Sequence, residues 1–215
     1  MSAEGFVMTR RSFSSLSLQD ALDLVPTERL TKWDLIAPDC APSDVLLAYL
    51  PRLDSFSLIS SEPAKILLID TILGEIATLY PQIKIWKGEP LEWGLISGVA
   101  DYLVAPNRAY AKTPLLCAIE AGYPLGGDDF VQGEAQCIGE MVVCQQNNAR
   151  DGHESEVYGI VSNGQVWVFY KLTPTSEVLV SRFFAADDLP KLLGALDHVF
   201  AACAANIPAK PDAVQ

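Results

Sequence analysis

The spacing of apolar positions changes several times along the chain. Between residues 62 and 80, apolar side chains recur every three or four positions, which predicts a helix with one buried face. Four other segments combine helical spacing with a polar residue suited to cap a helix at the start. The predicted helices are residues 18–25, 43–49, 62–80, from 128 or 129 to 147, and from 187 or 188 to 204.

The intervening segments have the patterns of strands. Residues 115–121 are almost wholly apolar, as expected of a strand buried on both faces. Asn163-Gly164 separates two β-type runs and predicts a hairpin turn. The predicted strands are residues 83–86, 99–105, 115–121, 157–161, 166–172 and 178–184. Because antiparallel strands precede a strand–helix–strand step, we expect an α/β protein with a mixed central sheet flanked by helices.

This order of elements suggests three parts. Residues 1–60 form a predicted N-terminal helical extension, whose first 17 residues are Ser-rich and expected to fray. Residues 61–205 form the predicted α/β domain, and residues 206–215 a loose tail. The strand at 178–184 is expected at a sheet edge, where it would offer a surface for a homodimer.

Composition narrows the range of partners. The net charge of −12 repels phosphate backbones at long range, so avid non-specific binding to DNA is disfavoured, although a local basic strip or a metal site remains compatible with it. The five cysteines include no CxxC pair, which favours a reduced protein in the cytoplasm. Without an apolar run of about 18 residues, no membrane span is expected.

Two acidic residues stand within predicted core strands. Asp101 lies in Gly-Val-Ala-Asp-Tyr-Leu-Val, and Glu120 lies in Leu-Leu-Cys-Ala-Ile-Glu-Ala. A carboxylate is expensive to bury unless it is paired or binds a metal. If the two lie close together they form a site of hard oxygens suited to Mg²⁺ or Mn²⁺. Otherwise each faces solvent or a basic neighbour at the end of its strand.

A helix that carries Glu62, the strand with Asp101, the apolar strand ending in Glu120 and a helix bearing Gln136 together resemble the PD-(D/E)XK nuclease superfamily. The likeness covers residues 61–172 and is greatest to small bacterial members related to the N-terminal nuclease region of restriction subunits. It implies a restriction-endonuclease-like fold acting on DNA.

The resemblance also assigns residue roles. It implies that Asp101 and Glu120 hold the metal, that Glu62 supports the metal through water, and that Gln136 faces the catalytic site. Glu75 is a second candidate for the role of Glu62. The alternative for Glu62 is an ordinary acid in the first turn of a helix, favoured by the helix dipole. The alternative for Gln136 is a solvated residue on its helix.

One residue of the family pattern is missing. The family has Glu-x-Lys, whereas this chain has Glu120-Ala121-Gly122, followed by a rewritten loop at residues 122–127. Two hypotheses follow. In the first, the chain is a catalytically impaired nuclease-like protein that serves as a binding or assembly module for a protein partner or a second copy. In the second, it is an active metal-dependent DNA endonuclease in which Lys112 or Lys171 replaces the lost lysine.

Overall fold

A single mixed sheet organises the residues that the structure, a computed structural model, describes: residues 10–26, 30–58, 62–122 and 128–208. The strand order is β1-β4-β5-β6-β7-β8-β2, with β3 paired to β4 and β9 paired to β7. β5 and β6 run parallel, and most other neighbours run antiparallel, so the predicted mixed sheet is confirmed. The strands are β1 (Arg11–Ser12), β2 (Thr31–Lys32), β3 (Ile83–Trp93), β4 (Ile96–Pro106), β5 (Cys117–Ala121), β6 (Val157–Ser162), β7 (Val166–Leu172), β8 (Val178–Val180) and β9 (Phe184–Ala185).

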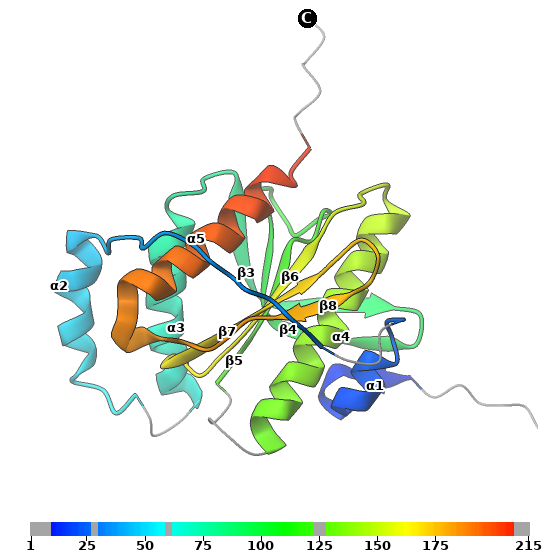
Figure 1. Cartoon of the computed structure of the whole chain (residues 1–215), viewed down its shortest axis with the longest axis horizontal. Coiled ribbons are helices and arrows are strands. Elements are labelled where there is room, and N and C mark those ends of the chain that lie inside the picture. Colours follow the sequence, from blue (N-terminus) through cyan, green and yellow to red (C-terminus); the bar gives the residue numbers. More distant parts are fainter. Residues whose placement is uncertain (1–9, 27–29, 59–61, 123–127, 209–215) are drawn as a thin grey trace, which may run out of the picture.

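Helices cover both faces of this sheet. Figure 1 shows α2, α3 and α5 on one side of the strands and α1 and α4 on the other. The helices are α1 (Leu18–Leu22), α2 (Asp44–Leu53), α3 (Glu62–Ala77), α4 (Asp128–Arg150) and α5 (Leu189–Ala205), with short 3-10 turns η1 (Phe13–Ser15) and η2 (Ala186–Asp188). Within the described ranges, none of them has the length and hydropathy needed to cross a bilayer.

The sheet separates two apolar layers. One layer packs α3 and α5 against the sheet and includes Ile69, Ile119 and Phe200. The other packs α4 and the N-terminal segment against the opposite face and includes Phe13 and Ile138. β5 and β6 are buried at every position between the two layers, which explains why the sequence of residues 115–121 is apolar without alternation.

Several elements differ from their predicted bounds. β3 and β4 are eleven residues each, longer than expected. β3 lies at the edge of the sheet, so its outward positions are polar and carry no apolar pattern. The predicted strand at 178–184 is split into β8 and β9, because the Ser181 hydroxyl accepts the hydrogen bond of the Phe169 amide in the ladder.

The edge expected at residues 178–184 is partly covered. Leu179 and Val180 of β8 pair with Thr31 and Lys32 of β2. The surface predicted for a homodimer is therefore occupied at these positions by the chain itself. The described residues before 61 thus contribute β1 and β2 to the sheet of the α/β domain.

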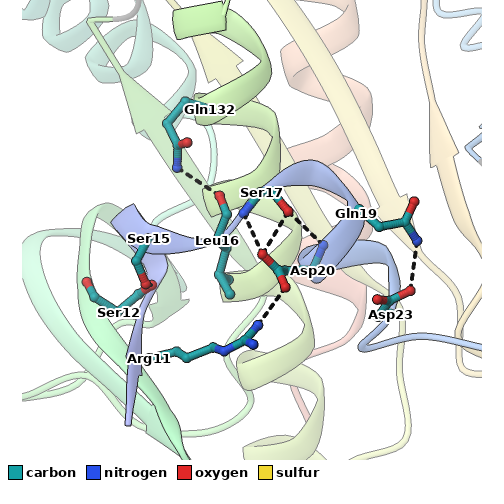
Figure 2. A network of polar contacts seen from close by, with 9 residues as sticks. All are labelled: Arg11, Ser12, Ser15, Leu16, Ser17, Gln19, Asp20, Asp23 and Gln132. Carbon is teal, nitrogen blue, oxygen red and sulfur yellow. Dashed lines mark hydrogen bonds and ion pairs between the residues drawn. The ribbon is translucent and has the colours of Figure 1, made fainter. Parts of the chain in front are cut away.

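The N-terminal segment of residues 10–25 packs against α4 instead of fraying. Phe13 lies over Gly98 of β4, where a Cβ would come 2.3 Å from its ring, and Leu16 lies over Gly139 of α4. Figure 2 shows Gln132 of α4 donating a hydrogen bond to the Leu16 carbonyl oxygen, at 3.0 Å. Ser17 caps α1, as predicted, by accepting the Asp20 amide. The Ser-rich composition of residues 1–17 gave no sign of this docking, in which Phe13 and Leu16 are the buried apolar residues before α1.

Candidate functional site

Asp101 and Glu120 come together on neighbouring strands. β4 and β5 are antiparallel, and their registered pairs end at Tyr102↔Ile119, one residue short of these two acids. The Asp101 carboxylate reaches β5, where its Oδ2 accepts a hydrogen bond from the Ala121 amide at 2.9 Å. The structure therefore places the two predicted ligands beside one another.

Gln136 binds the second of these acids. Its Nε2 atom donates a hydrogen bond to Glu120 Oε2 at 2.9 Å, from α4 to β5. The predicted alternative, a solvated helix residue, is wrong, because the amide reaches a residue that is 1% exposed.

A third carboxyl group, missed by the sequence reasoning, lies in the same place. Glu140 is one helical turn beyond Gln136 on α4 and is 0% exposed. Burial raises the pKa of Glu140 well above its usual value, and the charges of Glu120 and Asp101 raise it further. The raised pKa of Glu140 favours its protonated form, so that the neighbouring buried carboxyl groups do not all carry a charge. The four-residue spacing from Gln136 was the signal in the sequence.

A lysine reaches the strand end where a Glu-x-Lys pattern would place one. Lys65 of α3 donates a hydrogen bond from Nζ to the Gly122 carbonyl oxygen at 3.1 Å. Gly122 follows the last residue of β5 and donates its amide to the Ser162 carbonyl oxygen. It has a φ of +91°, a conformation that a lysine side chain disfavours, which gives a physical reason for glycine here.

The two lysines predicted as substitutes have other partners. Lys171 forms an ion pair with Glu156 at 3.2 Å, and its Nζ lies 5.2 Å from the centre of the Trp33 ring. Lys112 lies over Tyr110 in the connection from the end of β4 to the start of β5. Asp101 and Glu120 are several residues from that end of the two strands.

The helical acids are placed at the two ends of α3. Glu62 is the first residue of the helix, three positions before Lys65, and its side chain lies outside the described residues. Glu75 is near the other end, where its carboxylate accepts hydrogen bonds from the amide and hydroxyl of Ser43. Glu75 therefore fixes the start of α2. The predicted loop at 122–127 is described only at Gly122, and residues 123–127 lie outside the described residues.

A second polar cluster fixes α3 relative to β4 next to Asp101. The Tyr102 hydroxyl donates a hydrogen bond to Asp70 at 2.8 Å, and Lys87 forms an ion pair with the same carboxylate at 2.8 Å. Burial raises the pKa of Tyr102, as does its hydrogen bond to Asp70, so the phenol remains a donor at neutral pH. This contact positions the helix that carries Lys65 against the strand that carries Asp101.

Asp101 and Glu120 are oxygen donors of the type that binds a hard divalent ion. In the described part of the chain, no group of three or more His, Cys, Asp or Glu side chains is arranged to hold a metal. Mg²⁺ retains several waters and is commonly held by only one or two carboxylates, so Asp101 and Glu120 are a sufficient pair in chemical type. A divalent charge would also offset the repulsion among the clustered carboxyl groups.

Comparison with known proteins adds no assignment. No model of a known protein family matches the sequence, and no curated protein matches it significantly. The functional argument therefore depends on the residues of this site.

Proposed function

We propose that this chain is a metal-dependent phosphodiester hydrolase, a nuclease of the PD-(D/E)XK kind in which Lys65 replaces the missing lysine of the motif. The observation that carries the proposal is the 3.1 Å hydrogen bond from Lys65 Nζ to the Gly122 carbonyl oxygen. This bond places the ammonium group of Lys65, which is carried by α3, beside the end of β5 just after Glu120.

Each described residue then has a role. Asp101 and Glu120 would hold Mg²⁺ or Mn²⁺, which polarises a phosphoryl oxygen and lowers the pKa of a bound water when present. Gln136 orients Glu120 through its amide. Lys65 stabilises negative charge that develops on the phosphate in the transition state, the part that the motif lysine would otherwise take.

DNA is the proposed substrate, and the reduced state of the cysteines fits a cytoplasmic setting. All five cysteines are present as thiols. The net charge of −12 gives no long-range attraction for DNA, so binding would depend on the metal and on local basic side chains.

The test is cleavage of supercoiled plasmid and of labelled oligonucleotides in Mn²⁺ or Mg²⁺. We expect cleavage by the native protein, none by Asp101→Ala, and a rate lower by about 10²–10³ in Lys65→Met. Lys171→Met, whose ammonium pairs with Glu156, is the matched control and should cleave at the native rate. Equal rates for the native protein and Lys65→Met would show that Lys65 has no catalytic part.

A second candidate function is the catalytically impaired nuclease-like module that binds or assembles with a protein partner or a second copy. The burial of Glu120 and Glu140, at 1% and 0% exposure, favours it, because a buried acid pair can act as a structural element of the core. Under this proposal no divalent ion supports cleavage, and calorimetry detects no Mn²⁺ binding that Asp101→Ala removes. Light scattering during gel filtration would then report the oligomeric state.

A further inference from the structure

A cavity of about 770 Å³ lies between the β3–β4 hairpin, the connection after β4 and the last turns of α4. Its lining includes three basic and three acidic residues, an aromatic ring and a polar amide. These residues are Arg10, Lys112, Arg150, Glu89, Glu92, Asp151, Trp93 and Asn147. In a chain with a net charge of −12, a lining whose charges balance is a locally less acidic surface.

The cavity and the carboxylate site are separate places on α4. Gln136 and Glu140 face the sheet, where Glu140 is 0% exposed, whereas Asn147 and Arg150 lie in the last turns of the helix beside the cavity.

The basic groups are held by weak partners. Arg10 pairs with Glu92 and Arg150 pairs with Asp151, and all four side chains are well exposed. Lys112 lies over the ring of Tyr110, 4.6 Å from its centre. Exposed ion pairs contribute about 0–1 kcal/mol, so a phosphate group can compete with these carboxylates. The acids also keep this surface near neutral, while the chain as a whole is strongly acidic.

Trp93 provides a flat surface in a fixed place. It is 38% exposed, and the Arg150 guanidinium carbon lies 5.9 Å from its ring centre. Trp93 pairs with Ile96 at the end of the hairpin, and Asn147 donates a hydrogen bond to the adjacent Glu92 carbonyl oxygen at 3.1 Å. An exposed indole beside a guanidinium group is suited to stack a base and to bind its phosphate.

We propose that this cavity binds a nucleotide of a single-stranded nucleic acid. Trp93 stacks on the base, and Arg150 binds the phosphate, with Arg10 and Lys112 beside it. This inference goes beyond the proposed nuclease function, and the binding can be measured without cleavage.

The experiment is fluorescence anisotropy with a labelled 12-nucleotide oligo-dT in EDTA, at several salt concentrations. We expect Trp93→Ala and Arg150→Ala each to weaken binding by at least about fivefold. Arg150→Ala should also reduce the slope of log K against log salt by about 0.7, whereas Trp93→Ala should leave it unchanged. Arg182→Ala is the matched control, because this exposed arginine lies over Phe184 in a different cavity. Thermal unfolding of each variant checks that the fold is retained.

The outcomes separate the two proposals. If the native protein binds the strand and both variants bind as tightly as Arg182→Ala, the subsite is wrong. If the native protein cleaves duplex DNA but does not bind oligo-dT, the subsite is wrong and the nuclease proposal stands. If binding depends on Trp93 and Arg150 but no metal supports cleavage, the subsite stands and the nuclease proposal fails.

Discussion

Gln136 donates a hydrogen bond to Glu120 across 2.9 Å, which joins α4 to the middle of the sheet at a nearly inaccessible carboxyl group. The bond compensates part of the desolvation of that carboxyl group. It also defines where the carboxylate oxygens point, and so the direction from which a metal ion would approach.

Removal of this amide should destabilise the fold. Gln136→Ala leaves a buried acceptor with one donor fewer, so we expect the free energy of unfolding to fall by about 1–3 kcal/mol. Urea unfolding followed by circular dichroism measures it. Gln146→Ala, a partly exposed position on the same helix, should change stability by less than about 0.5 kcal/mol. An equal effect of the two substitutions would contradict a special role for Gln136.

A glycine in α5 allows the chain to cross the helix. A Cβ on Gly194 would lie 2.2 Å from the backbone oxygen of Pro38, which cannot rotate away. We therefore expect Gly194→Ala to lower stability by about 1–3 kcal/mol despite the better helix propensity of alanine. Gly74 in α3 has no neighbour within 4 Å of its built Cβ, so Gly74→Ala should raise stability by about 0.5–1 kcal/mol. If Gly194→Ala and Gly74→Ala shift the denaturation midpoint in the same direction, the steric explanation is wrong.

Phe13 and Gly98 should be energetically coupled. We expect Gly98→Ala alone to cost about 1–3 kcal/mol by overpacking, and Phe13→Ala alone about 3–5 kcal/mol through lost burial. In the Phe13→Ala background the Gly98 substitution should cost little, because the ring that it strikes is gone. A double-mutant cycle by urea unfolding measures the coupling, and additive effects would show that the ring does not occupy this site in solution.

Glu134 should make stability depend on pH. Burial raises the pKa of this carboxyl group above its ordinary value of 4.5, and the hydrogen bond from the Tyr170 hydroxyl partly opposes the rise. Between 4.5 and the raised value the folded state binds more protons than the unfolded state, so the free energy of unfolding falls as pH increases. Glu134→Gln removes this term and should show a smaller fall from pH 5 to pH 8 in urea unfolding. The exposed position Glu154→Gln serves for comparison, and parallel curves for native protein and Glu134→Gln would refute the prediction.

Local sequence patterns were sufficient to predict the main helices and strands and part of the candidate site. The helical spacing of residues 62–80 and the Asn163-Gly164 turn produced α3 and the β6–β7 hairpin nearly as expected. Asp101 and Glu120 stood out because a charged residue within an apolar strand needs a partner, and the structure brings them together. Each of these predictions depends only on residues that are close to one another in the sequence.

The residues missed by the sequence depend on packing between distant elements. Lys65 reaches Gly122 only because α3 crosses the end of β5, and 57 residues separate the two in the chain. Glu140 reads as one polar position on a long helix until α4 is docked over Glu120. Two-residue strands such as β1 and β2 have too few positions to show a period, so their pairing could not be expected.

The close approach of Phe13 to Gly98 and of Leu16 to Gly139 provides a criterion for recognising distant relatives. A sequence that keeps this N-terminal docking must have a residue without a side chain at the positions of Gly98 and Gly139, together with an apolar pair near its start. A relative with larger residues at both positions must hold its N-terminal segment elsewhere. This combination of four positions, far apart in the chain, identifies shared architecture even where the residues of the carboxylate site have changed.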